Sequence, residues 1–322
     1  MSSKLRIVFM GTPDFAVPAL DILVKNSYNI VGVITMPDKP AGRGYQLQPS
    51  PIKKYALTHN LNLLQPEKLK EESFLEALYA LKADLQIVVA FRMLPEVVWN
   101  MPKMGTFNLH SSLLPHYRGA APINRAIMNG EKISGVSTFF LQHAIDTGKI
   151  IFQESVDIAE DETAGELHDT LMILGSKLVL KTVKAIEEQN FTEIEQEKFI
   201  KDGTVLNEAP KIFKEDCRIN WNYAAEQIFN LIRGLSPYPA AFTELMDLKG
   251  NKTLLKLFKA SKIIETHHLN IGDIECDQKS YLKVAVKDGF VLLHEVQLAG
   301  KSRMNVENFL RGNKIEKGFK MI

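Results

Sequence analysis

Short apolar runs alternate with amphipathic segments through the first part of the chain, and this alternation limits the possible folds more than any other feature. Strand patterns occur at residues 6–10, 30–35, 85–91 and 105–110, and helical patterns occur at residues 12–25, 122–129 and 164–188. Strands that alternate with helices predict an α/β fold with a doubly wound, mostly parallel sheet of the Rossmann-like type. Thr12 is expected to cap the first helix, with Pro13 in its first turn.

A different pattern begins near residue 211. A helix is expected over residues 223–233, with Gly234 as its C-cap. Short strand-like runs follow at residues 241–245, 253–259, 282–286 and 291–297, and turn signals separate them. This spacing predicts a second, smaller β-barrel domain. We therefore expect a first domain over residues 1–190, a linker over 191–210 and the barrel over 211–322.

Length and cysteine content narrow the class of protein. A chain of 322 residues can form two domains that each bury a core. No apolar run reaches the about 18 to 20 residues of a membrane span, and the first residues lead straight into a strand pattern, so neither a membrane span nor a secretory signal is expected. Cys217 and Cys276 lack metal-ligand or redox spacing. Both are expected to be reduced thiols, which favours a cytoplasmic location.

The formal charge gives only a weak signal about partners. The net charge is +1, with 18 basic against 14 acidic residues from Asn207 onward and 21 against 24 before it. A solvated, lysine-rich surface explains this asymmetry as well as phosphate binding does. Composition alone therefore does not predict a nucleic-acid partner.

Three polar residues form a candidate catalytic set. Asn108 and His110 lie two residues apart in an expected strand, so their side chains share one face, and ligands of such sheets bind beyond the strand ends. Asp146 lies in a turn between two apolar runs. An amide donor, an imidazole and an orienting carboxylate suit acyl transfer, although each residue singly could serve a turn, a core or a cap. Ser111 and Ser112 are expected in a turn, since no Ser-His-Asp arrangement is evident.

The order and spacing of these motifs add a family resemblance. Residues 108–123, followed by Ile-Asp-Thr-Gly at 145–148, resemble the folate-dependent formyltransferase superfamily. Further matches to the methionyl-tRNA formyltransferases within it occur at residues 11–20, 37–44, 219–221 and 232–239. The resemblance therefore covers nearly the full chain.

The resemblance implies transfer of a formyl group from 10-formyltetrahydrofolate to the α-amino group of methionyl initiator tRNA, for translation initiation. The second domain is then an OB-like barrel that binds tRNA. A formyltransferase acting on an amino-sugar nucleotide or another small amine is the alternative. Glycinamide ribonucleotide formyltransferases share the core motifs but lack a second domain, and a catalytically silent RNA-binding protein would not need the three polar residues intact.

The resemblance also assigns residues to the reaction. Asn108, His110 and Asp146 are expected to be catalytic, without a metal, in a monomeric enzyme. Contacts to the folate are expected from Val89, Phe91, Arg92, Leu94, Ser111, Leu113, Leu114, Pro115 and Asp146. Arg92 stands where relatives commonly have a glycine, which leaves the local conformation open.

The remaining assignments concern the tRNA. Residues 36–51 hold four prolines and two glycines, so an irregular loop is expected, either functional or simply mobile. The resemblance implies that this loop contacts the acceptor end through Arg43, assisted by Lys39. Phe15 is expected to line the methionyl pocket or to pack within its helix. Candidate backbone contacts of the second domain and linker are Lys201, Lys211, Lys214, Lys249, Lys252, Lys301 and Arg303.

Overall fold

The computed structural model describes residues 5–41, 46–200, 203 and 205–322, and these fall into two compact units. The first unit comprises Met1–Gly119, Ser134–Val156 and His168–Glu208. The second comprises Ala120–Ile133, Asp157–Leu167 and Ala209–Ile322. Within the described residues, no helix is long and apolar enough to cross a membrane.

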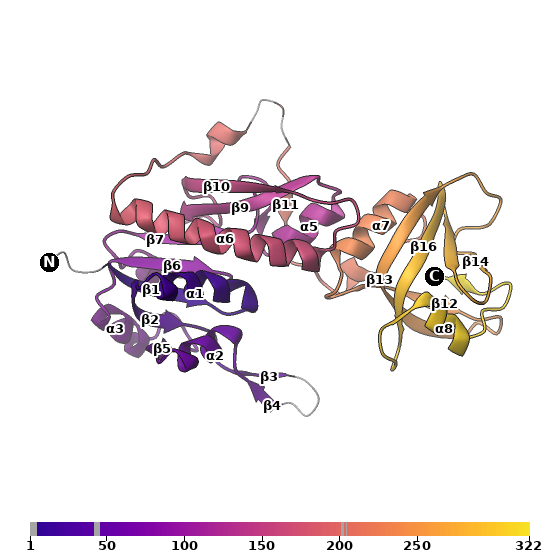
Figure 1. Cartoon of the computed structure of the whole chain (residues 1–322), viewed down its shortest axis with the longest axis horizontal. Helices are drawn as coiled ribbons and strands as arrows, with labels where there is room; N and C mark the ends of the chain where they lie inside the picture. Colours follow the sequence, from indigo (N-terminus) through magenta and orange to yellow (C-terminus); the bar gives the residue numbers. More distant parts are fainter. Residues whose placement is uncertain (1–4, 42–45, 201–202, 204) are drawn as a thin grey trace. The chain divides into compact units, whose positions relative to one another are not determined.

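The first unit is built on one mixed sheet with the strand order β10-β9-β7-β6-β1-β2-β5 (Figure 1). The strands are β1 (Arg6–Gly11), β2 (Asn29–Ile34), β5 (Leu63–Leu64), β6 (Leu85–Val89), β7 (Thr106–His110), β9 (Ile133–Phe140) and β10 (Ile150–Asp157). Neighbours from β5 to β7 pair in parallel, whereas β9 runs antiparallel to β7. The sheet is therefore mostly parallel, as the alternation predicts.

Helices cover both faces of this sheet. They are α1 (Val17–Lys25), α2 (Pro51–Thr58), α3 (Glu72–Ala80), α4 (Glu96–Trp99) and α6 (Ala164–Glu187). On one face, Phe74 of α3 packs with Val8 of β1 and Val88 of β6. On the other, Gly175 of α6 lies so close to Leu109 of β7 that a Cβ atom there would be 2.7 Å from its Cδ2. The sheet is thus doubly wound, and the predicted fold class is confirmed.

The start of the first helix differs from the prediction. A short 3-10 turn, η1 (Asp14–Ala16), precedes α1, and Pro13 rather than Thr12 occupies its cap position. The Asp14 carboxylate accepts the Phe15 amide at 3.0 Å, so the tight turn satisfies its own donor. The Thr12 hydroxyl is buried without a hydrogen-bond partner among the described residues. The prediction that Thr12 caps the helix is therefore wrong.

The segment over residues 36–51 is also more regular than expected. It forms an antiparallel hairpin of β3 (Lys39–Ala41) and β4 (Gln46–Gln48), followed by α2, whose N-cap Ser50 accepts from Lys53 N. Pro40 is tolerated because a strand in a two-stranded ribbon has one edge that pairs with nothing. The tip of this hairpin, including Arg43, lies outside the described residues.

The second unit is a nearly closed antiparallel barrel with the strand order β14-β15-β16-β13-β12-β18. Its strands are β12 (Ala241–Met246), β13 (Lys252–Ile264), β14 (Ile274–Cys276), β15 (Leu282–Val286), β16 (Gly289–Leu298), β17 (Met304–Asn305) and β18 (Lys320–Met321). A bridge between Asp273 and Lys320 joins the two edges. Met321 N also donates to Gly272 O at 2.9 Å, so the sheet curls back on itself. The predicted small barrel is confirmed.

Three helical segments accompany the barrel: α5 (Pro122–Met128), α7 (Ala225–Gly234) and α8 (Val306–Gly312). Gly234 is the last residue of α7 and not its C-cap, which is Leu235. A Cβ atom at Gly234 would lie 3.0 Å from Met128 N and 3.2 Å from Asn124 O. The glycine therefore allows α5 and α7 to approach closely, and the prediction of a capping role is wrong.

Candidate active site

The end of β7 presents two polar side chains on one face of the first sheet. Asn108 and His110 alternate with Leu109, whose side chain packs against α6 on the opposite face. His110 is buried, with 6% of its surface exposed, whereas Asn108 is partly exposed. Both residues lie at the carboxyl end of a parallel strand, where ligands of such sheets bind.

One nitrogen of the His110 ring makes a hydrogen bond, and the other faces a carboxylate. Nε2 donates to the main-chain oxygen of Tyr117 at 2.7 Å, and Nδ1 lies 3.9 Å from Asp146 Oδ2. A neutral imidazole can donate from only one nitrogen, so the Tyr117 carbonyl places that proton on Nε2. Nδ1 then faces the carboxylate at a distance longer than a direct hydrogen bond. The structure thus brings His110 and Asp146 together.

Asp146 lies in a tight loop, residues 145–148, which we call the Asp146 loop. Its Oδ2 accepts the Gly119 amide at 3.0 Å, and its backbone has a φ of +53°, a region that aspartate tolerates better than most residues. Gly148 follows, and a Cβ atom there would lie 1.7 Å from Phe140 O. Gly148 is therefore required by the way this loop packs against the end of β9, and Asp146 suits the backbone conformation at its own position.

The Gln196 side chain fixes the Asp146 loop, and the sequence alone did not identify this residue. This side chain is fully buried. Its Nε2 donates to Asp146 O and Gly148 O, both at 2.8 Å, while Oε1 accepts from Arg118 Nε at 3.0 Å and Nη2 at 2.6 Å. Gln196 lies in the short 3-10 turn η2 (Gln196–Phe199), inside the segment interpreted as a linker. No periodic pattern marks a glutamine that acts 50 residues away.

The three consecutive residues 117–119 therefore set the geometry of the whole site. The Tyr117 carbonyl accepts from His110, the Arg118 guanidinium binds Gln196, and the Gly119 amide binds Asp146. Each uses a different chemical group, and two of the three groups belong to the main chain. The sequence motif contains this segment, but its role is visible only in three dimensions.

The residues expected to contact folate differ in how far their side chains are buried. Val89, Leu94 and Leu114 are buried, the last two in hydrophobic clusters, so only their main-chain groups can be offered to a ligand. Phe91, Ser111 and Leu113 are partly exposed, whereas Pro115 is buried yet lines a cavity beside the Asp146 loop. Among the described residues of this set, Asp146 is the one whose side chain lies beside the His110 ring.

Arg92 occupies the position where a glycine is expected. Its guanidinium donates to Glu67 O at 2.7 Å and to Pro66 O, and it lies 5.7 Å from the centre of the Phe91 ring. Burial lowers the pKa of the Arg92 guanidinium below its ordinary value. The side chain thus ties the segment after β6 to the loop that precedes α3.

The residues expected to contact tRNA are scattered. Phe15 is 7% exposed and meets His168 edge-on, with 5.3 Å between the ring centres. Lys39 is exposed on β3. In the second unit, Lys211 Nζ lies 5.5 Å from the Phe213 ring centre, and Lys214 directly precedes a 3-10 turn, η3 (Glu215–Cys217). Arg43 and Lys201 lie outside the described residues.

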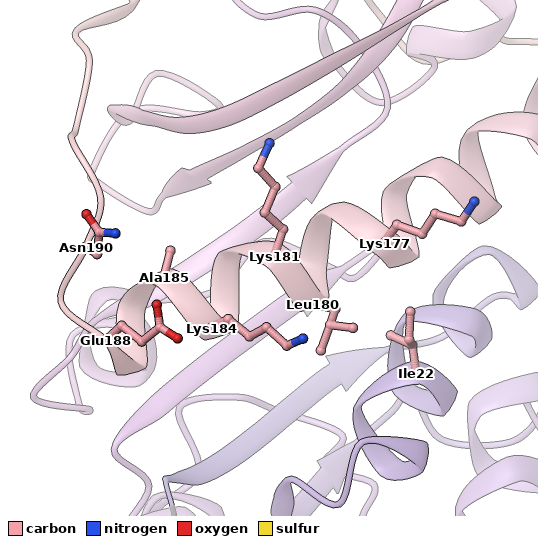
Figure 2. A pocket seen from close by; sticks show the side chains of 8 residues that line it. All are labelled: Ile22, Lys177, Leu180, Lys181, Lys184, Ala185, Glu188 and Asn190. Carbon is pink, nitrogen blue, oxygen red and sulfur yellow. The ribbon is translucent and has the colours of Figure 1, made fainter.

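A second hollow, of about 420 Å³, lies along α6, and Ile22 of α1 also lines it. Figure 2 shows Lys177, Lys181 and Lys184 along this helix, with Ile22 of α1 beside Leu180. Lys181 already pairs with Glu154 at 2.8 Å. None of the three polar residues of the candidate site lines this hollow, so we do not include it in the site.

Comparisons with known proteins identify the family of the chain. The model of the formyl transferase family matches residues 5–183, and that of the formyl transferase C-terminal domain matches residues 211–314. Methionyl-tRNA formyltransferase of Bacteroides thetaiotaomicron is 59% identical over 98% of each chain. The enzyme of that name from Flavobacterium johnsoniae is 53% identical over 96% of each chain.

Solved structures share the fold at lower identity. An N-formyltransferase from Helicobacter canadensis, in complex with folinic acid and dTDP-3-aminofucose, aligns with a TM-score of 0.66 and 23% identity, over 90% of this chain and 98% of that one. HypX from Aquifex aeolicus, in complex with tetrahydrofolic acid, aligns with a TM-score of 0.62 and 18% identity, over 99% of this chain and 51% of that one. Taken with the family models and the full-length relatives, these findings show that the chain belongs to the formyl transferase family and, within it, to the methionyl-tRNA formyltransferases.

Proposed function

We propose that this protein transfers a formyl group from 10-formyltetrahydrofolate to the α-amino group of methionyl initiator tRNA, for translation initiation. The observation that carries this proposal is the 59% identity to a methionyl-tRNA formyltransferase over 98% of both chains. The sugar N-formyltransferase is only 23% identical and indicates the fold alone. The amino-sugar alternative therefore has no support of its own.

The proposed reaction is direct attack of the amine on the formyl carbon. A carbon–nitrogen bond forms to the methionyl amine, a tetrahedral oxyanion results, and its collapse breaks the bond to N10 of the folate. One proton leaves the amine and one proton enters N10, so the exchange is balanced. Because an aminoacyl ester amine is only weakly basic, a neutral nucleophile is present near neutral pH and no covalent enzyme intermediate is needed.

Each member of the trio has a role in this step. The Asn108 side chain is partly exposed at the end of β7, so its amide can donate to the oxyanion. His110 uses Nε2 to hold Tyr117, which leaves Nδ1 for the reacting groups. Asp146 orients the ring from 3.9 Å and, with a water molecule, accepts the proton that the amine releases.

The donor is proposed to bind beside this trio. Folate is a planar, polar ring system that main-chain amides and carbonyls can recognise by hydrogen bonding. Residues 89–94 and 113–115 offer such groups, with Val89 and Leu114 fixing the backbone through their buried side chains. Arg92 braces the first of these segments against residues 66–67.

The acceptor is proposed to be held by parts outside the trio. We assign the methionyl side chain to the neighbourhood of Phe15 and the acceptor stem to the β3–β4 hairpin, with Lys39 and Arg43. Lys211 and Lys214 are proposed to contact the tRNA backbone from the barrel domain over residues 211–322. A catalytic domain over residues 1–190, a monomeric state and a cytoplasmic location complete the proposal.

One incubation series tests the function. The protein is supplied with 10-formyltetrahydrofolate and, in separate reactions, methionyl initiator tRNA, glycinamide ribonucleotide or an amino-sugar nucleotide, and formylated products are measured by mass spectrometry. We expect formylmethionyl-tRNA as the only rapid product. Preferential formylation of either small amine would contradict the proposal.

A further inference from the structure

Tyr117 carries the carbonyl that accepts from His110, and its own backbone is strained. Its φ is +60°, a left-handed conformation that a bulky side chain rarely adopts. Such a conformation is unfavourable and persists only where the surrounding structure fixes it. The direction of this carbonyl therefore depends on the groups that hold Tyr117, because the tyrosine by itself does not favour it.

Asn207 holds the strained residue at two points. Its main-chain oxygen accepts the Tyr117 amide at 2.6 Å, and its Nδ2 donates to the Tyr117 hydroxyl at 3.2 Å. The Asn207 amide also donates to His116 Nδ1 at 3.4 Å, so the preceding residue is tied to the same asparagine. One residue thus binds both the backbone and the far end of the Tyr117 side chain, which is buried.

Asn207 is 90 positions away from Tyr117 in the chain, inside the segment predicted to be a linker. It directly precedes β11 (Glu208–Ala209), and Tyr117 directly precedes β8 (Arg118–Gly119). The two short strands pair with each other, which brings Asn207 to Tyr117. Both residues belong to the first unit, together with His110 and Asp146.

The direction of the Tyr117 carbonyl decides where His110 carries its proton. The carbonyl accepts from Nε2 at 2.7 Å, and Nδ1 faces the Asp146 carboxylate at 3.9 Å. The hydrogen bond made by one ring nitrogen sets which nitrogen of a neutral imidazole is protonated. If the carbonyl turned away, Nε2 would lose its acceptor and the carboxylate would draw the proton to Nδ1. Nδ1 would then no longer offer its lone pair to the reacting groups.

We propose that Asn207 is a positioning residue for the reaction, which keeps the His110 proton on Nε2 by holding Tyr117 in its strained conformation. The effect on the rate rests on the proposed function. The protonated nitrogen of His110, in contrast, is a property of the free protein and can be measured without any substrate.

The first test removes the side-chain contact. Asn207→Leu keeps a similar volume without a donor, and it should lower kcat by about five- to tenfold with the KM for methionyl-tRNA and for 10-formyltetrahydrofolate unchanged. Asn207→Asp should keep most of the wild-type kcat, because the Tyr117 hydroxyl can donate to a carboxylate. Asn190→Ala, which removes an exposed amide just after α6, is the control and should match the wild type.

A second variant breaks the same hydrogen bond from the other side. Tyr117→Phe removes the hydroxyl and should lower kcat to a similar extent. The combination of Asn207→Leu with Tyr117→Phe should be no slower than the slower single variant, because both changes remove one contact. Losses of kcat that multiply in the double variant would overturn the inference.

The decisive readout is the position of the His110 proton. The ring nitrogens of the eight histidines are labelled with 15N, and the His110 signals are assigned by their loss in His110→Gln. Spectra recorded at a pH where imidazoles are neutral should show the proton on Nε2 in the wild type and in Asn207→Asp. In Asn207→Leu the averaged signals should shift toward protonated Nδ1.

The outcomes separate this inference from the proposed function. If the wild-type protein does not formylate methionyl-tRNA, the proposed function fails, and the NMR comparison still tests the role of Asn207. A folded Asn207→Leu protein with the proton on Nε2 as in the wild type would overturn the inference, whatever its kcat. A lower Tm with an unchanged position of the proton would show that Asn207 only stabilises the fold.

Discussion

The Asp146 loop and the β3–β4 hairpin carry two different parts of the proposed reaction, and they are held in opposite ways. The loop is fixed on both sides, by the buried Gln196 and by the Gly119 amide. Among the described residues, the two hairpin strands pair with each other and with no other strand, and Lys39 on β3 is exposed. At the base of the hairpin, the Asp38 carboxylate accepts hydrogen bonds from Lys53 of α2 and from Gln65.

This difference separates chemistry from recognition. Groups that stabilise a transition state act best when they need no rearrangement at the moment of reaction, and a loop that is hydrogen-bonded on both sides meets that need. A segment that binds a large partner gains from a protruding surface with few internal ties. Changes near the loop should therefore lower kcat, and changes on the hairpin should raise the KM for tRNA.

The largest effect is expected from Asp146→Ala. Removing the carboxylate leaves His110 without its partner at 3.9 Å and the Gly119 amide without its acceptor, so kcat should fall by at least about 10². Steady-state kinetics with saturating tRNA and folate measure this. Intact activity at every pH would remove Asp146 from the mechanism.

Gln196→Ala should be the next most damaging change, because it frees the loop without touching a reacting group. We expect kcat to fall by roughly tenfold, and the free energy of unfolding to fall by about 2 kcal/mol, since the partly buried Arg118 guanidinium and two carbonyls lose their partner. Gln142→Ala is the matched control: this exposed amide of the adjoining turn donates to the Thr147 hydroxyl at 2.7 Å. Equal losses in both variants would refute a positioning role for Gln196.

Lys39→Ala tests the role of the β3–β4 hairpin in binding tRNA. A lysine that contacts a phosphate adds salt-dependent affinity, so the KM for tRNA should rise several-fold and the salt dependence of binding should weaken by about one unit of log–log slope. The rate at saturating tRNA should not change. Lys54→Ala, an exposed lysine on α2 outside the hairpin, serves as the control. A salt dependence as steep as in the wild type would argue against the hairpin contact.

The smallest effect concerns the base of the hairpin. The hydrogen bonds from Lys53 at 2.7 Å and Gln65 at 3.0 Å lower the pKa of Asp38. Lys53→Met should raise that pKa toward its ordinary value, as followed by NMR titration. In the wild type, the contribution of Asp38 to stability is present above its ordinary pKa and is lost as the pH falls through the lowered value. An Asp38 pKa that does not move would show that Lys53 does not anchor the hairpin.

The sequence predicted well what depends on local periodicity. A period of two places Asn108 and His110 on one face of β7, and the alternation of strands and helices predicts the doubly wound sheet. The sequence-based prediction failed where a contact between residues distant in sequence determines the structure. Gln196 has no local signature, and Gly234 is needed because α5 approaches, not because the chain turns there.

The hairpin shows a different limit of sequence reasoning. Prolines and glycines predict irregular structure, yet a two-stranded ribbon accepts Pro40 because one edge of each strand pairs with nothing. Arg92, in the segment after β6, shows the same limit, since its hydrogen bonds to residues 66–67 depend on a loop far away in sequence. Both features become visible only when segments distant in sequence are placed together.

The most direct test of this division compares Asn108→Ala with Lys39→Ala in single-turnover formylation across a range of methionyl-tRNA concentrations. Asn108→Ala should lower the saturated rate by roughly 10² and leave the half-saturating tRNA concentration unchanged. Lys39→Ala should do the reverse, with a wild-type saturated rate and a higher half-saturating concentration. If Asn108→Ala instead keeps a near wild-type saturated rate, the assignment of chemistry to the end of β7 is contradicted.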